Sequence, residues 1–206
     1  MLCLVAALGW GSAGYASIIN FTYTSDYTNF QCYVNYDYGN SVANIDGDQY
    51  ASPGHMSGYF YTDSAEDPKA TKSYQILNES GFTWAGYNVN VYMDRAFSIS
   101  NAFATLPADW TVAVTQPVYN GATPSYFGLN EYVGYVKFMA GTLVPDGSQL
   151  NFQYDVGFGG ATTYRFADEL IPVEAVPEPG VAPLLAGAAM LLFGVRWAVR
   201  RSARTH

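Results

Sequence analysis

Catalytic chemistry in this sequence would have to start from a single histidine and scattered carboxylates. His55, in the segment Pro53-Gly54-His55, is the one histidine between residues 17 and 180. Nucleophilic catalysis needs a nucleophile, a base and an acid that orients the base. No hydrolase elbow, zinc-protease motif, phosphate-binding loop or Cys-x-x-Cys pair accompanies His55. We therefore interpret His55 as a surface loop residue and expect that the protein is not an enzyme.

Paired carboxylates are the other route to catalysis, because two facing acids can hydrolyse a glycosidic bond on a β-sandwich. The candidates lie on polar strand faces or in turns: Asp94, Glu131, Asp155, Asp168 and Glu169. Nothing in their spacing marks two of them as facing each other. Solvation of an acidic surface is the simpler explanation, and glycan hydrolysis is the least favoured alternative.

A calcium site is the next candidate, because Asn44, Asp46 and Asp48 place oxygen atoms at alternate positions, as calcium loops do. An EF-hand is excluded, since the glycine and the bidentate acid that its loop requires are both missing. Asp46-Gly47 is primarily a hairpin signal. We expect no metal or other cofactor, with a turn-bound calcium at these three residues as a weak alternative.

Aromatic residues supply a clue to binding, since the chain contains 18 tyrosines. Tyr33, Tyr92 and Tyr132 fall opposite the predicted core face. Exposed tyrosine beside Asn and Asp is typical of surfaces that contact carbohydrate or protein, because a phenol combines a rigid apolar face with a polar tip. This pattern favours a lectin-like module that binds exopolysaccharide. The simpler alternative is that both faces of a two-layer sandwich contain some tyrosine.

The elements that carry these residues are predicted to be strands, because apolar residues recur with period two. In the segment 30–38 the even positions are apolar, while Gln31, Asn35 and Asp37 face the other way. Further strong strands are predicted at 87–93, 110–115, 135–139 and 150–156, and weaker ones at 18–24, 58–62, 74–77, 97–99 and 163–166. Turn sequences such as Asp46-Gly47 separate them. The pattern predicts an all-β, antiparallel two-sheet sandwich, Ig-like or jelly-roll-like, with a closed barrel as the alternative.

The N-terminal residues 1–16 are apolar, lack charge and end in small residues, which is typical of a secretory signal peptide cleaved between Ala16 and Ser17. Cleavage would remove Cys3 and leave Cys32 alone, which excludes an intramolecular disulfide. Cys32 lies on the apolar side of its strand, so we interpret it as a small buried hydrophobe. The processed domain would keep five basic residues against 17 acidic ones, and this charge disfavours nucleic-acid binding.

The C-terminus carries the most specific pattern of the sequence. Val176, Pro177, Glu178 and Pro179 precede an apolar run, and the cations that follow are Arg196, Arg200, Arg201 and Arg204. This order resembles the PEP-CTERM sorting signal of Gram-negative bacterial surface proteins. The corresponding division of the chain is a signal peptide at 1–16, a sandwich at 17–171, a Pro-rich linker at 172–180, a transmembrane helix at 181–199 and a basic cytoplasmic tail at 200–206.

The resemblance implies that the protein is exported, held transiently in the inner membrane and cut near the Pro-Glu-Pro motif by an exosortase. It would then reach the cell surface or the extracellular matrix of a biofilm. Exosortase, the membrane and exopolysaccharide are the implied partners, and a permanent anchor is the alternative. A looser resemblance of residues 78–156 to the β-domains that carry such signals implies that Trp84 and Trp110 pack in the core.

Overall fold

The structure is a computed structural model that describes residues 16–121 and 131–176. Several predicted features lie outside these ranges: residues 1–15 of the expected signal peptide, the expected sorting residues Pro177, Glu178 and Pro179, the apolar segment 181–199 and the basic tail. Within them the chain forms eleven strands and no helix. Accordingly, no helix in the described part is long and apolar enough to span a membrane.

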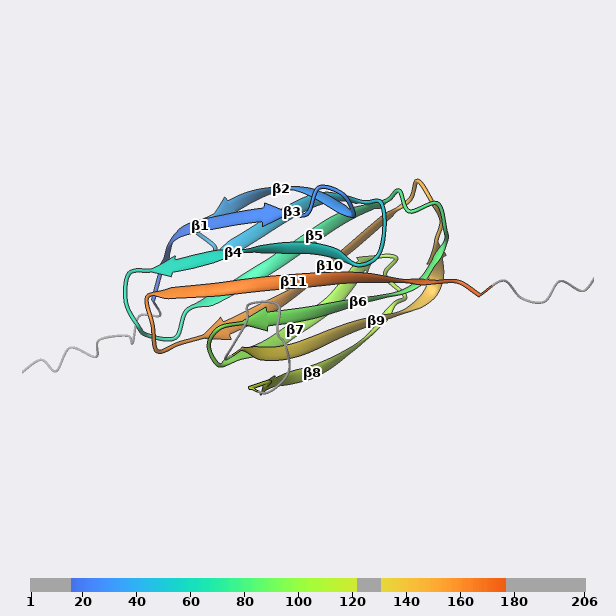
Figure 1. Ribbon diagram of the computed structural model, residues 1–206. Helices are drawn as coiled ribbons and strands as arrows, with labels where there is room; N and C mark the ends of the chain where they lie inside the picture. The colour runs from blue at the N-terminus through green and yellow to red at the C-terminus, as the bar shows by residue number, and fades with distance from the viewer. Residues whose placement is uncertain (1–15, 122–130, 177–206) are drawn as a thin grey trace, which may run out of the picture. The chain divides into compact units, whose positions relative to one another are not determined.

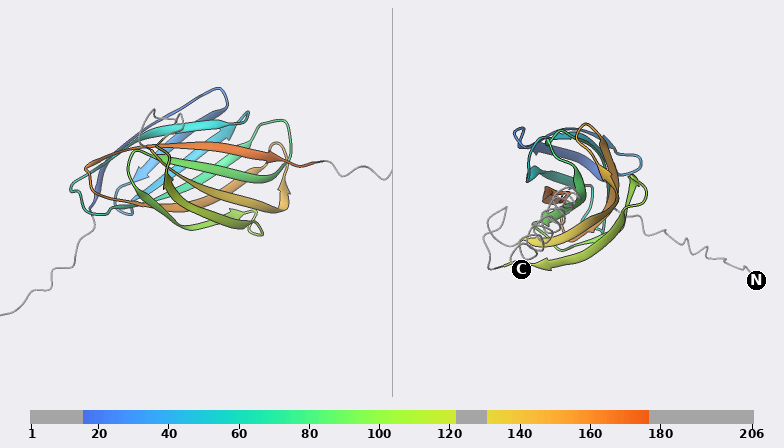
Figure 2. Two further views of the ribbon diagram at one scale, coloured as in Figure 1. Left: turned by 60° about the horizontal axis from the view of Figure 1, so that its bottom comes forward. Right: turned by 90° about the vertical axis from the view of Figure 1, so that its right-hand side faces the viewer.

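Two sheets build the fold. The strands are β1 (Ile18–Ser25), β2 (Phe30–Asp37), β3 (Val42–Gln49), β4 (Gly54–Thr62), β5 (Lys69–Asn78), β6 (Trp84–Met93), β7 (Phe97–Leu106), β8 (Thr111–Tyr119), β9 (Tyr132–Val144), β10 (Gln149–Phe158) and β11 (Thr163–Glu174). A six-stranded sheet has the order β1-β4-β11-β6-β9-β8, and a five-stranded sheet has the order β2-β3-β5-β10-β7. The two layers lie against each other and curve around a shared core (Figures 1 and 2). The predicted all-β sandwich is confirmed.

The core follows from the alternation that the sequence predicted. Along β10, Leu150, Phe152, Tyr154 and Val156 are buried at every second position, as expected for a strand with one face on the core. From Tyr87 to Met93, strand β6 repeats the pattern. The two indole rings expected in the core are indeed buried, at Trp84 and Trp110.

The polar edges of these indoles are satisfied locally. Trp84 Nε1 donates to Ser80 Oγ at 2.9 Å, and Trp110 Nε1 donates to the Thr142 carbonyl at 2.6 Å. A buried N–H without a partner would cost stability, so each ring is oriented by its hydrogen bond as well as by packing.

Strand β3 departs from the prediction. The expected turn at Asp46-Gly47 is wrong, because both residues lie within β3, which pairs antiparallel with β2 and parallel with β5. A Cβ atom at Gly47 would stand 2.7 Å from the Phe30 ring, so this glycine leaves room for the ring to cover the strand. The parallel pairing of β3 with β5 is likewise an exception to the predicted antiparallel sheets.

The C-terminal strand is longer than predicted. We expected a linker to begin at residue 172, whereas β11 continues to Glu174, and Pro172 lies opposite Tyr87 of β6. Strand β11 occupies the middle of the six-stranded sheet, between β4 and β6 (Figure 1). Because β1 and β11 both run antiparallel to β4, the described chain enters at one end of the sandwich and leaves at the other.

Candidate ligand-contact face

The outer surface of the five-stranded sheet is rich in amide side chains. Since successive side chains point to opposite faces, the apolar residues that β2, β3, β5 and β10 bury leave their polar neighbours outside. We call this surface the amide face. Its residues are Gln31, Tyr33, Asn35, Asn44, Asp46, Asp48, Ser73, Gln75, Gln149, Asn151 and Gln153.

Strand register arranges these side chains in rows across the sheet. In one row Tyr33 lies opposite Asp46, Asp46 beside Gln75, and Gln75 opposite Asn151. The next row runs in the same way through four strands, from Asn35 to Gln153. At a strand spacing of about 4.8 Å, each row extends about 15 Å. A long ligand could therefore lie across the strands and meet one polar group at each step.

Two shallow hollows lie on the amide face on either side of Tyr33. One, of about 220 Å³, is lined by Tyr33, Asn35, Asn44, Ile45, Asp46, Ser73 and Gln75. The other, of about 260 Å³, is lined by Gln31, Cys32, Tyr33, Asp46, Gly47 and Asp48. Tyr33 and Asp46 belong to both hollows, and the Tyr33 side chain is 69% exposed. The exposure expected for Tyr33 is confirmed, and its ring is available to stack against a ligand.

The chemistry of the amide face suits neutral polar ligands. Each Asn or Gln side chain offers two N–H donors and a carbonyl acceptor, which matches the mixed donor and acceptor groups of a hydroxyl. Asn151 Oδ1 is buried and has no hydrogen-bond partner among the described residues. Gln149 Nε2 donates only a long bond, 3.4 Å, to Gln75 Oε1. These two side chains therefore keep hydrogen-bonding capacity that the fold does not fully use.

Asp155 lies at one end of the amide face. Its carboxylate accepts hydrogen bonds from Thr71 Oγ1 at 2.6 Å and Asn101 Nδ2 at 2.7 Å, and Lys69 Nζ lies 2.7 Å away. Burial acts to raise the pKa of Asp155, but the hydrogen bonds and the charge of Lys69 outweigh it and hold the pKa below its usual value. This carboxylate therefore connects β10 to β5 and β7.

The geometry of β3 does not support the calcium hypothesis. Asn44, Asp46 and Asp48 lie on the same outward face of an extended strand, where alternate residues are about 6.6 Å apart, and they do not curl around a common point. In the part of the chain that the structure describes, no group of three His, Cys, Asp or Glu side chains could hold a metal ion.

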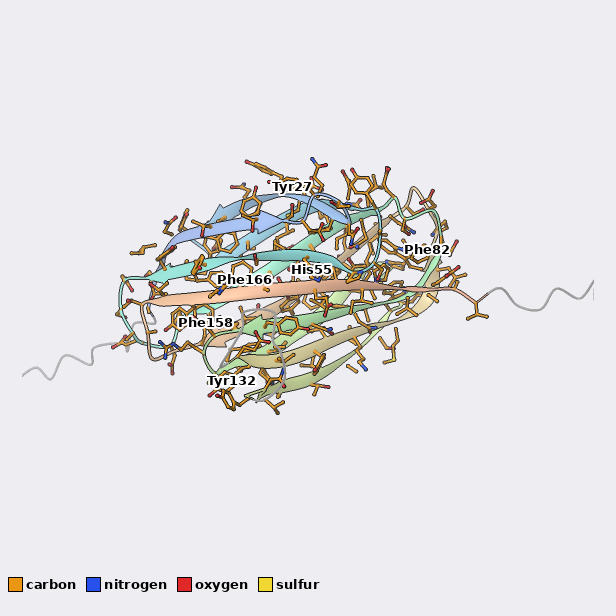
Figure 3. All side chains as sticks on the ribbon, viewed as in Figure 1. Tyr27, His55, Phe82, Tyr132, Phe158 and Phe166 are labelled. Carbon is orange, nitrogen blue, oxygen red and sulfur yellow. The ribbon has the colours of Figure 1, made fainter. Side chains whose placement is uncertain are left out.

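His55 lies on the outer face of the six-stranded sheet, and its predicted placement in a loop is wrong because it belongs to β4. Its Nδ1 is 3.3 Å from Asp26 Oδ2, and its Nε2 is 3.6 Å from Glu169 Oε1. Glu169 Oε2 also accepts hydrogen bonds from Asn90 at 2.7 Å and Tyr92 at 2.9 Å. Figure 3 shows His55 beside β4 and β11. The imidazole thus bridges two carboxylates.

Asp26 ties the cluster of His55, Asp26 and Glu169 to the backbone. Its Oδ1 accepts the backbone N–H groups of Asn29 and Phe30 at 3.0 and 2.7 Å, and its Oδ2 accepts that of His55 at 3.0 Å. The carboxylate thereby fixes the turn between β1 and β2 to the start of β4. The hydroxyl of Tyr92 donates to Glu169, so it is a hydrogen-bond donor in this cluster and not an activated nucleophile.

The five carboxylates considered for glycoside hydrolysis occupy separate places. Asp155 lies at one end of the amide face, Asp168 is buried in the core, and Glu169 lies on the outer face of the six-stranded sheet. Asp94 follows the end of β6, where its Oδ1 accepts the backbone N–H of Arg165, and Glu131 is buried just before β9. Burial raises the pKa of Asp94.

Cys32 and the remaining tyrosines complete the set of predicted residues. Cys32 is half-buried against the core, and burial raises the pKa of its thiol to about 11, which agrees with an unreactive packing residue. Tyr92 and Tyr132 are half-buried, unlike Tyr33. The Tyr132 ring packs 5.3 Å from that of Tyr119. Among the three tyrosines singled out from the sequence, Tyr33 is the one that stands on an open face.

Comparison with protein-family models, curated proteins and solved structures found no match to this chain.

Proposed function

We propose that this chain is a non-enzymatic structural protein of the bacterial cell surface or extracellular matrix. In this proposal it is exported, held transiently in the inner membrane and processed by an exosortase at its C-terminal signal. The supporting observation is the end of the fold: β11 stops at Glu174, and Val176, the first residue of the sorting motif, is 87% exposed. The exposure of Val176 directly after the last strand supports access of an enzyme to the start of the proposed motif.

The opposite end of the domain suits the proposed cleavage by signal peptidase. Ser17, the expected new N-terminus, directly precedes β1, and its backbone nitrogen lies 2.8 Å from Asp63 Oδ1. Asp63 in turn donates its N–H to the Ser17 carbonyl at 3.1 Å. Cleavage would place an ammonium group beside the Asp63 carboxylate and form an ion pair at the start of the sheet.

The processing step is tested by the mass of the protein recovered from the cell surface or the culture medium. We expect that protein to lack the segment containing Arg204 and His206. Glu178→Ala should leave a full-length chain in the membrane fraction, whereas Glu174→Ala, which changes a nearby acid in β11, should be processed normally. Recovery of surface protein that still carries His206 would establish the permanent anchor instead.

A second function, polysaccharide binding, is favoured by the amide face. Exposed Tyr33 stands between two hollows, and a row of polar side chains, Asp46, Gln75 and Asn151, extends from it across the next three strands. Sugar rings present apolar faces that stack on aromatic rings and hydroxyl groups that pair with amides. Binding of matrix polysaccharide through this face would retain the processed protein outside the cell.

Retention of the processed protein on immobilised exopolysaccharide tests this second function. Tyr33→Ala should weaken binding about tenfold, equivalent to about 1.4 kcal/mol, without changing the melting temperature. Tyr59→Ala is the matched control, because Tyr59 is an exposed tyrosine on the other sheet. A chelator should leave retention unchanged, since Asn44, Asp46 and Asp48 lie along a strand. Equal binding by the two variants would rule out the amide face as the surface that binds polysaccharide.

A further inference from the structure

A lysine and an aspartate meet inside the core, between the two sheets. Lys72 extends from β5 of the five-stranded sheet, and Asp168 extends from β11 of the six-stranded sheet. Both residues are 0% exposed. Lys72 Nζ lies 2.9 Å from one carboxylate oxygen of Asp168 and 2.6 Å from the other. The amine is therefore held against the carboxyl group that it could attack.

The surroundings of this pair are aromatic, which makes charge separation costly. Lys72 Nζ lies 4.0 Å from the centre of the Phe166 ring and 5.9 Å from those of Phe60 and Tyr154. Ring faces attract a cation, and so does Asp168, yet desolvation dominates and lowers the pKa of Lys72. Transfer of one proton from the ammonium group to the carboxylate would remove both charges from the core and leave a nucleophilic amine beside a carboxylic acid.

Two tyrosine hydroxyl groups lie near the carboxyl group of Asp168. Tyr74 Oη donates to Asp168 Oδ2 at 2.5 Å, and the Tyr154 hydroxyl lies 3.5 Å from that of Tyr74. Burial, followed by the neighbouring charge of Asp168, raises the pKa of both phenols well above the usual value, so they stay protonated as donors. A donor fixed at Oδ2 would stabilise negative charge that develops on this oxygen when the carbon is attacked.

We propose that Lys72 and Asp168 condense into an intramolecular isopeptide bond. The neutral Lys72 Nζ attacks Asp168 Cγ, and Tyr74 stabilises the oxygen that becomes negative in the tetrahedral intermediate. The other oxygen leaves as water, carrying the proton of the carboxylic acid and one proton from Nζ. An N–C bond forms and a C–O bond breaks, with no oxidant or other reactant needed.

Confinement by the fold accelerates this otherwise slow reaction. Groups held in contact behave as if each were present at about 10⁵ M or more, and the buried site keeps bulk water away from the product. The amide would tie the two sheets together across a sequence separation of 96 residues. Cys32 is the one cysteine in the described ranges, so no disulfide performs this role there. A covalent bridge suits a protein exposed outside the cell, but it is independent of both proposed functions.

Tryptic mapping of the unaltered protein tests the bridge directly. We expect a branched peptide in which residues 70–95, uncut after Lys72, are joined to the peptide that starts at Phe166. The mass of the branched peptide should be lower than the summed masses of the two peptides by the mass of one water molecule. Separate peptides with normal cleavage after Lys72 would overturn the proposal, and this result does not depend on the folding of any variant.

Variants then test the chemistry. Lys72→Met should abolish the branched peptide. Tyr74→Phe keeps the ring but removes the donor, and we expect condensation in freshly folded protein to slow at least tenfold. Tyr87→Phe is its matched control, because Tyr87 is also buried but its hydroxyl donates to Gln49 Oε1 instead. Equal rates in the two tyrosine variants would remove Tyr74 from the mechanism. Sorting and polysaccharide binding can be measured separately on the same proteins.

Discussion

Asp155 shows how a single carboxylate links the pH to the stability of the amide face. Its pKa in the folded chain is below the ordinary value of 3.8, whereas in the unfolded chain it regains that value. The ionised group therefore stabilises the fold at pH values above 3.8, and this contribution is lost as the pH falls through the folded-state pKa. Acid should consequently loosen the contact between β5, β7 and β10 that Asp155 holds.

The prediction at this site is that Asp155→Asn lowers the free energy of unfolding by about 2 kcal/mol at neutral pH. The difference from the unaltered protein should shrink as the solution is acidified below the folded-state pKa, because both side chains are then uncharged. Urea unfolding at several pH values measures it. Asp46→Asn, at an exposed position of the same sheet, serves as the control. A difference that stays constant with pH would contradict the assignment.

At the scale of elements, β1 depends on a glycine in its neighbour. Gly58 of β4 lies where an added Cβ atom would stand 1.9 Å from the Thr22 carbonyl oxygen of β1, an overlap that requires backbone movement. Gly58→Ala should thus destabilise the protein by about 1–3 kcal/mol and detach this edge strand first. Hydrogen exchange of the β1 amides would report the detachment. Gly39→Ala, in a turn with more space, should have little effect, and equal effects of both variants would refute the explanation.

A side chain joins the two sheets at β8. Gln116 Nε2 donates to the Ile99 carbonyl of β7 at 2.7 Å, and Gln116 Oε1 accepts the Ile99 N–H at 3.1 Å. Gln116→Ala would leave both backbone groups without these partners, so we expect a loss of about 2 kcal/mol and faster exchange of the Ile99 amide. Gln116→Glu retains the acceptor but not the donor. Unchanged exchange at Ile99 in the alanine variant would show that the contact is unimportant.

The sequence was most informative where every second residue is apolar. Strand β10 has that pattern over its whole length and β6 has it from Tyr87 to Met93, so the buried and exposed faces of these segments were predictable. Strand β3 was missed because Asp46-Gly47 has the composition of a turn. Its place in the sheet depends on Phe30 covering Gly47 and on parallel pairing with β5, and both are long-range contacts. Likewise, the residue type of Pro172 suggested a linker, whereas its place in β11 depends on pairing with β6.

The candidate site, too, depends on long-range contacts that the sequence pattern does not reveal. The alternation in β2 predicted that Tyr33 and Asn35 point outward, but it did not specify which side chains stand beside them. Asp46, Gln75 and Asn151 form one row with Tyr33 only through the registers of three strand pairs. The contact between Lys72 and Asp168 was even less predictable, because nothing near either residue in the sequence indicates that they meet in the core.

For the whole molecule, charge limits what the amide face can bind. The domain that the proposed processing would leave, residues 17–180, has five basic and 17 acidic residues, a net charge of about −12. On the amide face itself, Asp46 and Asp48 add negative charge, while Lys69 at its end is paired with Asp155. The field of such a domain repels anionic polymers at long range. For the proposed polysaccharide binding, the charge distribution accordingly favours a neutral polymer.

The last prediction follows from this field and distinguishes specific stacking from simple adhesion. Binding of the processed protein to a neutral polysaccharide should change little as the salt concentration increases, because stacking on Tyr33 and amide hydrogen bonds carry no net charge. Binding to an anionic polysaccharide should be weak at low salt and strengthen with added salt, since the Debye length falls to about 10 Å at 0.1 M and repulsion is screened. Titrations at a series of salt concentrations, with Tyr33→Ala beside the unaltered protein, measure both trends. Strong binding of the anionic polymer at low salt would mean that a local basic site overrides the acidic domain, and the amide face would then not be the binding surface.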